Sequence, residues 1–582
     1  MKDHRAFQYY SRLLSFEAKQ DNLTSLAEIA EVLCTTPRHS RTLLQQLQER
    51  GWLSWTPKVG RNQRSILHLR FSLIELQQQL AKRMIEGGQY KKALELVNGD
   101  QNQFAALLQQ TSGATLREGQ LHIQLTYQRI FSQLLPHKPL RNSERFLVRQ
   151  VYACLTSCDE TGQIHPQLAH HWHHNKDATV WRFYIRPQLR FHSAKPIDAP
   201  LISELFNQLK SLPEYRQELS HLVKTSASHQ CVTFELDSPD LGFAGLLSDL
   251  RYSIQPPLQL ANNQSDSIDG CGPFQVIEQS DKRLRLQAFE HYFSLRSLTD
   301  TVTIWQFDQT PSERIQFSRS GQDSSNASIE HPAHLLKTND AEANSSQSRI
   351  ENGCIYLLFN MNSKPHSLSF AQRKYLSKLL SPDLILAQEG LSELLLASEL
   401  ANSLLPGWTK VQPQEMEQTP LPDKLDIAAY DHLVILDCAN ALCAQLNQMG
   451  TASQVNVYPF SELHQQAEQG VLEEAIVIAS LNVDDNLPVS VFRWFCSNPI
   501  LHHGLSSEAK CWLNEQLGDI RQNCDVGGYL NKLESIGTTM QYENWLTPLF
   551  HHRQTLRWRG VLQGVTMTDW SWPDFKNVWT DE

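Results

Sequence analysis

Five side chains between residues 38 and 45 have types and a spacing that suit hydrogen bonding to a nucleic acid. The positions i, i+3, i+4 and i+7 are occupied by Arg38, Arg41, Thr42 and Gln45, and His39 lies beside them. Such a spacing places side chains on one face of a helix. Residues of these kinds read base edges when the start of a helix docks in the major groove. The spacing therefore predicts a helix whose exposed face binds double-stranded DNA.

A second basic element follows in the segment 56–64, which reads TPKVGRNQR. It carries three cations, Lys58, Arg61 and Arg64, among turn-forming residues. A turn-rich segment between two apolar runs is typical of a β-hairpin. Cations at the tip of a hairpin can bind the phosphates of a DNA backbone. We therefore predict that these three side chains belong to a DNA-contacting wing.

Capping signals and apolar spacing define the elements that must position both features. Ser25 opens a capping box before a short helix, and Pro37 suits the first position of the next helix. That second helix is expected to end before Gly51, where a left-handed residue commonly follows a helix. Strands are expected at 53–55 and 65–71, which alternate in polarity. The order predicts a winged helix-turn-helix domain over residues 1–72.

The charge distribution separates this domain from the rest of the chain. Residues 1–70 carry 11 Lys and Arg against 6 Asp and Glu, a net charge of +5. The whole chain has a net charge of −10, so the other 512 residues sum to −15. A basic domain on an acidic body indicates a polyanionic partner for the first and a different partner for the second. The alternative is a helix-turn-helix that contacts protein through a merely solvated charged face.

Helices are expected in a connector over residues 73–115, which can either dimerise the chain or pack within it. The 582 residues are too many for one core and indicate several domains. The sequence contains no apolar run long enough for a signal peptide or a membrane span, so we expect no membrane partner and a cytoplasmic protein. The 11 scattered cysteines fit a reducing compartment.

The acidic body, residues 116–582, mixes strand and helix patterns and is expected to be α/β. Strands are predicted at 121–127, 180–185, 231–236, 355–359 and 433–436. The polar segment 320–349 has few apolar residues, which predicts a flexible insertion.

Several body segments resemble the family 5 extracellular solute-binding proteins, a family of periplasmic peptide and nickel receptors. The matching segments are 151–155, 162–169, 181–192, GCGPF at 270–274, 359–374 and 404–407, whereas 193–200 and 320–349 depart from the family pattern. The resemblance implies a two-lobed α/β domain of the type II periplasmic-binding-protein kind with a ligand cleft. It also makes Tyr152, Asn360 and Trp408 candidate ligand contacts, because they lie near segments that approach the cleft in that family.

The combination of a winged helix with such a body resembles the SgrR-type bacterial transcriptional regulators. The strings that carry this likeness are 38–44, 50–53, 60–61, 76–79 and 181–184. The resemblance implies control of transcription by the first domain and sensing of a small metabolite by the second, with a link to sugar-phosphate stress. A sugar phosphate is thus one candidate ligand, and a homo-oligomer stays open. The alternative is a cytoplasmic solute-binding or scaffolding protein whose helix-turn-helix contacts protein.

A dense group of histidines is the remaining candidate for chemistry. It consists of His165, His170, His171, His173 and His174. Imidazoles at this density can bind zinc or nickel, but a solvated edge is the simpler interpretation. The sequence contains no catalytic-triad, phosphate-loop or metalloprotease motif. We therefore expect no metal, no cofactor and no catalysis.

Overall fold

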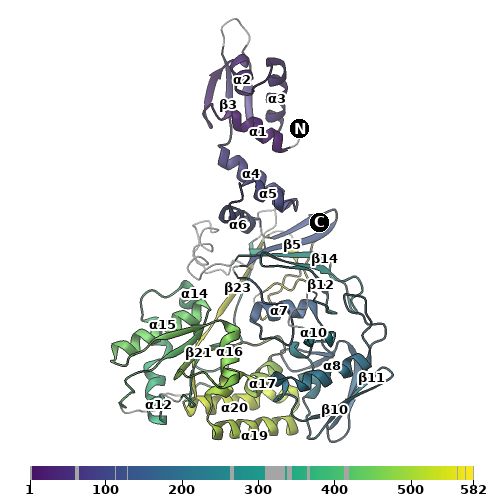
Figure 1. The fold of residues 1–582 in the computed structure, drawn as a ribbon, viewed down its shortest axis with the longest axis vertical. Helices are drawn as coiled ribbons and strands as arrows, with labels where there is room; N and C mark the ends of the chain where they lie inside the picture. The colour runs from purple at the N-terminus through teal and green to yellow at the C-terminus, as the bar shows by residue number, and fades with distance from the viewer. Residues whose placement is uncertain are drawn as a thin grey trace. The chain divides into compact units, whose positions relative to one another are not determined.

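The computed structural model describes residues 3–58, 64–111, 113–127, 129–261, 268–307, 335–336, 344–363, 367–411, 418–559, 562–570 and 572–580. The chain divides into two compact units, Met1–Ser112 and Gly113–Glu582 (Figure 1). Within the described residues, no helix is long and apolar enough to cross a membrane. Mixed helices and strands in both units confirm the predicted multidomain α+β class.

The first unit begins with a winged helix-turn-helix. Its elements are α1 (Asp3–Leu13), β1 (Asp21–Thr24), α2 (Leu26–Val32), α3 (Pro37–Glu49), β2 (Leu53–Thr56) and β3 (Ser65–Leu69). The strands form an antiparallel sheet in the order β1-β3-β2. The two predicted helices and both predicted strands are present, whereas α1 and β1 were not predicted.

Local capping explains where the helices of this domain begin. Ser25 and Glu28 form the reciprocal capping box at the start of α2. The hydroxyl of Thr36 accepts from the amide of His39 at the start of α3. Against these helices, Tyr10 of α1 packs edge-on to the buried Trp52, with ring centroids 5.9 Å apart. Caps set the helix starts, and the aromatic pair ties α1 to the residues that precede β2.

Three helices complete the first unit. They are α4 (Leu73–Glu86), α5 (Tyr90–Leu96) and α6 (Gln101–Gln110). A second capping box, between Ser72 and Glu75, starts α4. The helix stops before Gly87 and Gly88. Residues 113–115, which the sequence places in the connector, belong instead to strand β4 of the second unit.

The second unit contains three main sheets, each with its own apolar core. The five-stranded sheet has the order β12-β13-β14-β5-β4, and only β14 and β5 run parallel. Its strands are β12 (Phe274–Gln279), β13 (Arg283–Ala288), β14 (Thr299–Gln306), β5 (Gln120–Tyr127) and β4 (Gly113–Arg117). The four-stranded antiparallel sheet has the order β10-β11-β9-β8, and α8 (Ala199–Ser211) packs on it. Its strands are β10 (Leu222–Ser228), β11 (Cys231–Leu236), β9 (Val180–Ile185) and β8 (Ala169–His174).

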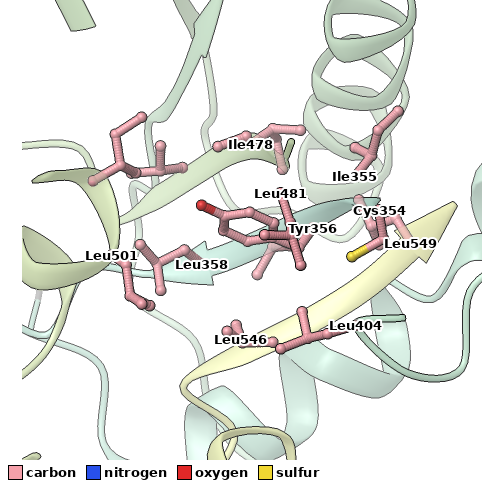
Figure 2. Packing of buried hydrophobic residues seen from close by; sticks show 14 of the residues in the cluster. Cys354, Ile355, Tyr356, Leu358, Leu404, Ile478, Leu481, Leu501, Leu546 and Leu549 are labelled. Carbon is pink, nitrogen blue, oxygen red and sulfur yellow. The ribbon is translucent and has the colours of Figure 1, made fainter. Parts of the chain in front are cut away.

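The six-stranded sheet is mixed and has the order β18-β22-β17-β21-β19-β20. Its strands are β18 (Glu399–Leu400), β22 (Leu546–His551), β17 (Cys354–Phe359), β21 (Ile476–Leu481), β19 (Ile427–Tyr430) and β20 (Val455–Tyr458). Every residue of β17 is buried, as expected for a continuous apolar run in a central strand. Figure 2 shows Tyr356 and Leu358 of this strand among side chains from β21 and β22.

Helices cover the sheets and connect them. They include α7 (Asn142–Val151), α12 (Phe370–Leu379), α15 (Leu433–Gln448), α16 (Phe460–Gln469), α17 (Leu487–Ser497), α18 (Pro499–Gly504), α19 (Ser507–Asn523) and α20 (Tyr529–Tyr542). A 3-10 turn, η2 (Leu250–Tyr252), follows the four-stranded sheet in sequence. The helices α17, α19 and α20 pack against one another (Figure 1).

One predicted strand is wrong. The sequence predicts a strand at 433–436, but these residues begin the helix α15. Its buried residues Val434, Ile435, Cys438 and Leu442 follow a helical spacing that continues past the short apolar run. A run of four apolar residues does not by itself distinguish a strand from a buried helix, and here the length of the pattern decides.

The glycine turn at 270–274 is explained by a close approach of two backbones. A Cβ on Gly270 would lie 2.1 Å from the carbonyl oxygen of Val151, and one on Gly272 would lie 2.6 Å from its carbonyl carbon. Only glycine permits this contact between the turn and the end of α7. The turn therefore positions Val151 and the residue that follows it, Tyr152.

The predicted insertion 320–349 lies in part outside the described residues. Two pieces of it are described, Leu335–Leu336 and the part of β16 (Asn344–Ile350) before residue 350. Both pieces pair with β23 (Arg553–Arg559). Residues 344–349 are thus part of a three-stranded sheet rather than a flexible segment.

Candidate functional site

The exposed face of α3 carries the five side chains that the sequence singles out. Arg38, His39, Arg41, Thr42 and Gln45 are all exposed. The opposite face of the helix is buried, through Ser40, Leu43, Leu44 and Leu47. Burial of that stripe sets the rotation of the helix, so the five polar side chains are presented to solvent by the packing of the domain.

The polar groups on this face differ in what they already contact. The Thr42 hydroxyl is 3.5 Å from the carbonyl oxygen of Arg38, and the Gln45 side-chain amide donates to Glu49 at 3.1 Å. Among the residues that the structure describes, no ion pair engages Arg38 or Arg41. The two guanidinium groups therefore keep their donors available for a partner.

The predicted wing is described only at its two ends. Lys58 is exposed, and its backbone amide donates to the Ser65 hydroxyl at 3.2 Å. Arg64 is also exposed and lies 3.6 Å from Glu28 of α2. Hydrogen bonds from Thr24 and Ser25, together with the charge of Arg64, lower the pKa of the Glu28 carboxyl. Arg61 lies outside the described residues.

The three candidate ligand contacts in the body lie within its packing. Tyr152 is buried, and its hydroxyl accepts from Gln259 at 3.5 Å. Burial raises the pKa of this phenol. Asn360 is 1% exposed, and its amide donates to the carbonyl oxygens of Leu472 and Glu474. Both side chains therefore have structural partners.

The third candidate, Trp408, is half-buried and packs against α20. A Cβ on Gly537 would lie 2.9 Å from its indole ring, so the glycine makes room for it. None of the three candidates is among the described residues that line the large cleft of the body. Tyr152 and Asn360 are thus buried in the body, Trp408 packs against its core, and all three lie outside the lining of this cleft.

That cleft has a volume of about 1410 Å³ and was not located by the sequence. One side comes from residues 137–145, 213–220 and 250–251, and the other from Tyr430 and residues 460–521. The two sides are separated by more than 170 residues in sequence. No local motif signals such a cleft, because it exists only after the lobes have packed.

Cations predominate among the described side chains that line the cleft. Seven are basic, namely Lys138, Arg145, Arg216, Arg251, Arg493, Lys510 and Arg521, and two are acidic, Glu214 and Glu468. The cleft lining is therefore net basic, whereas the whole chain is net acidic. A cleft with this lining favours anionic over cationic ligands.

Several of these arginines form ion pairs with buried carboxylates. Arg145 donates to Asp484 at 2.7 Å, and Arg493 donates to Asp249 at 2.9 Å. Both carboxylate side chains are fully buried. Each pair joins the two sides of the cleft, since Arg145 and Asp249 precede residue 252 and their partners follow residue 483. The arginines therefore hold the cleft walls together as well as lining it.

The protonation of this region follows from the pairing. Burial alone would raise the pKa of Asp249, but Arg493, Arg145 and Arg149 outweigh it, so the pKa lies below its usual value. At Asp485 desolvation outweighs the charge of Arg149, and the pKa is raised to about 7. The charged form of the Asp249 carboxylate is thus stabilised by the arginines that face it.

Lys510 and Arg216 differ from the paired arginines. Within the described part of the chain, neither cation takes part in an ion pair. Burial lowers the pKa of Lys510. These two cations are therefore the ones that an incoming anion meets without displacing a carboxylate.

Aromatic rings complete the lining of the cleft. Tyr430 and Phe460 meet edge-on with centroids 5.2 Å apart, and Trp494 also lines the cleft. The indole nitrogen of Trp494 is buried and has no hydrogen-bond acceptor among the described residues. The cleft therefore offers flat apolar surfaces beside its cations, a combination typical of small-molecule sites.

The histidine group lies on and before the edge strand β8. His170, His171 and His173 are exposed, and the last two lie beside the ring of Tyr184. His165 instead contacts Asp159 at 3.0 Å. Among the residues described, no group of three or more His, Cys, Asp or Glu side chains is arranged to hold a metal ion. The histidines are arranged as a solvated edge of the sheet.

Sequence comparisons match both units of the chain. Residues 5–119 match the family model of the sugar transport-related sRNA regulator N-terminal domain. Residues 163–373 match that of the bacterial extracellular solute-binding proteins, family 5. The HTH-type transcriptional regulator SgrR of Yersinia enterocolitica is 29% identical over 590 residues, covering 100% of this chain and 99% of the relative. That of Escherichia coli K12 is 28% identical over 593 residues, with the same coverage.

Solved structures show the fold of the body. The oligopeptide-binding protein AppA of Bacillus subtilis aligns with a TM-score of 0.63 and 15% identity, covering 80% of this chain and 100% of its own. NikA of Brucella suis aligns with a TM-score of 0.60 and 16% identity, covering 79% and 100%. The predicted two-lobed solute-binding fold is thus confirmed. The N-terminal match, the solute-binding segment and the full-length relatives agree, so the chain is similar over its whole length to the HTH-type transcriptional regulators SgrR and combines an SgrR N-terminal domain with a family 5 solute-binding domain.

Proposed function

We propose that the chain is a DNA-binding transcriptional regulator that acts in the cytoplasm and senses a small metabolite through its solute-binding domain. The observation that carries the DNA-binding part is the exposed face of α3, where Arg38 and Arg41 are exposed and outside every described ion pair. Its full-length relatives are named as HTH-type transcriptional regulators. The sensing part is supported by the cleft of the body, and we assign no catalysis.

We further propose that the ligand is a small anion, with a sugar phosphate as the first candidate. Support comes from the cationic and aromatic lining of the cleft. A phosphoryl group suits cations such as Arg216 and Lys510, and a sugar ring can pack on aromatic side chains. For the ligand to regulate, it must bind one conformation of the protein better than another.

The DNA-binding part is tested by filter binding of the full chain to mixed double-stranded genomic fragments. The variant is Arg38→Ala with Arg41→Ala, and the matched control is Arg182→Ala, an exposed arginine of β9 in the body. We expect the double variant to lose binding and the control to keep it. Equal binding by all three proteins at moderate salt would contradict the assignment. Sedimentation of the complex measures whether one copy or two binds.

The sensing part is tested by a thermal shift of the full chain with glucose 6-phosphate, glucose and inorganic phosphate. A ligand at 100 times its Kd adds about 2.7 kcal/mol to the stability of the unit that binds it. We expect stabilisation by the phosphorylated sugar that Lys510→Gln weakens and the exposed control Lys224→Gln leaves unchanged. Equal shifts with glucose and its phosphate would contradict an anionic ligand.

A further inference from the structure

The polar groups on the α3 face are unequal as readers of DNA bases. The Gln45 amide is engaged by Glu49, and the Thr42 hydroxyl by the carbonyl oxygen of Arg38. Reading adenine requires the amide donor and the carbonyl of a glutamine at the same time, so the pairing with Glu49 opposes it. Of these five side chains, Arg38, Arg41 and His39 remain with uncommitted side-chain heads.

The rotation of the helix separates His39 from the two arginines. Successive residues of an α-helix turn by about 100°, so His39 lies about a quarter turn from Arg38. The buried residues Ser40, Leu43, Leu44 and Leu47 define the opposite side. Arg38 points away from that stripe, whereas Arg41 lies about 60° from Arg38 on one flank of the helix and His39 about 100° from Arg38 on the other. Docking by the flank that Arg38 and Arg41 share therefore brings the two arginines to the groove and leaves His39 on the other side of the helix.

The spacing of the arginines limits which base pairs they can reach. Three residues of an α-helix rise by about 4.5 Å, and base pairs follow one another every 3.4 Å or so. The two guanidinium groups therefore meet neighbouring or next-but-one base pairs. Arginine is the side chain that pairs bidentately with the O6 and N7 atoms of guanine.

We propose that Arg38 and Arg41 each read one guanine in the major groove, on adjacent or next-but-one base pairs of the operator. This inference rests on the proposed DNA binding and adds the base that is read and the residue that reads it. Lys58, at the base of the wing, contacts phosphate and carries no base preference. Glu49, at the far end of the same face, repels phosphate and ends the reading surface after Gln45.

The test is selection of duplexes from a randomised library by the full chain, so no operator has to be known. Wild type should enrich two guanines separated by no more than one base pair. Arg41→Ala should still select DNA but randomise one of the two guanines, and Arg38→Ala the other. Lys58→Ala is the matched control, because loss of a phosphate contact weakens all sequences alike.

A second measurement identifies the atom that is read. Replacing one selected guanine by 7-deazaguanine removes the N7 acceptor and should weaken wild-type binding about tenfold. The same replacement should have no further effect on the variant whose arginine reads that base. Unchanged melting temperatures show that the variants are folded.

The outcomes separate this inference from the proposed function. If wild type selects no sequence and binds no duplex, the DNA-binding function itself fails. If wild type selects a sequence without guanines, or if 7-deazaguanine leaves its affinity unchanged, guanine readout is overturned while DNA binding stands. Randomisation of neither guanine by Arg41→Ala likewise overturns the assignment to Arg41.

Discussion

The α3 face and the body cleft are both rich in arginine, but the two sets of arginines are in opposite states. Arg38 and Arg41 are exposed and outside every described ion pair. Arg145 and Arg493 are held by the fully buried carboxylates of Asp484 and Asp249. An exposed cation without a partner costs little in the free protein and can neutralise a phosphate or read a base. A buried cation must be compensated within the protein, so its first role is to hold the structure together.

The difference teaches that residue type alone does not assign a binding site. The net positive charge of the first 70 residues marks the winged helix-turn-helix domain, because the cations of that domain lie on its surface. In the cleft the same residue type is largely neutralised by the chain itself. The cations that a ligand meets there are the few, such as Lys510, that are outside the described ion pairs.

The largest expected effect is a loss of stability on removal of a paired cleft arginine, which removal of an exposed α3 arginine should not cause. Arg493→Ala should destabilise the body by about 3–5 kcal/mol, because it removes the arginine that pairs directly with the buried Asp249 carboxylate. Arg493→Met combined with Asp249→Leu should recover most of that loss. Urea unfolding of the full chain measures both. A loss below about 1 kcal/mol for the single variant would show that the cleft arginines are not structural.

Acid should act on the body through its buried histidines first. Burial lowers the pKa of His192 and of His552 to about 4, below the value near 6.5 of the unfolded chain. The unfolded state then binds more protons, so stability falls as the pH drops from about 6.5 to 4. Below that range, protonation of Asp249, whose pKa lies below its usual value, removes a further contribution to the stability of the body. Urea midpoints at pH 7, 5.5 and 4.5 should decrease in that order, and His192→Gln should reduce the decrease.

Salt should affect DNA binding by the α3 face and the wing much more than it affects the stability of the body. DNA binding by the exposed cations should weaken steeply between 50 and 200 mM salt, because each phosphate contact releases a counterion. Lys58→Ala should reduce the slope of log K against log salt by about 1. The stability of the body should change little over the same range, because buried pairs are weakly screened. A salt-independent affinity for DNA would contradict phosphate contacts in the wing.

The smallest expected effect is the absence of a stability change. Arg41→Ala should alter the melting temperature of the chain by no more than an exposed substitution does, within about 0.5 kcal/mol, although it weakens DNA binding. A larger loss of stability would mean that Arg41 has a structural partner, and the contrast with Arg493 would then fail. Differential scanning calorimetry of both variants makes the comparison directly.

Much of the fold followed from local patterns in the sequence. The capping box at Ser25, Pro37 at a first helical position and Gly51 after the helix end predicted α2 and α3, because such signals act over a few residues. The strands at 180–185 and 231–236 match β9 and β11 because alternation is also local. The helix α15 resembles a strand at its start because its first four residues are all apolar, and only the longer pattern that follows them distinguishes it as a helix.

The candidate ligand site could not be predicted in the same way. Tyr152, Asn360 and Trp408 were chosen from segments near the cleft in similar proteins, yet each is engaged within the packing. Proximity of a segment to a cleft does not say which way its side chains point. The lining cations come from elements hundreds of residues apart, and only their packing brings them to one cavity.

By itself, the sequence determined the two-domain organisation, the winged helix and the set of side chains on the α3 face. These properties depend on spacing, caps and charge within short segments, which the residue order states directly. The tertiary structure alone decided where the cleft lies and which cations are paired. Burial and pairing depend on residues that meet only after folding, as Arg145 meets Asp484 and Arg493 meets Asp249. Long-range packing therefore determines which charges are available to a ligand.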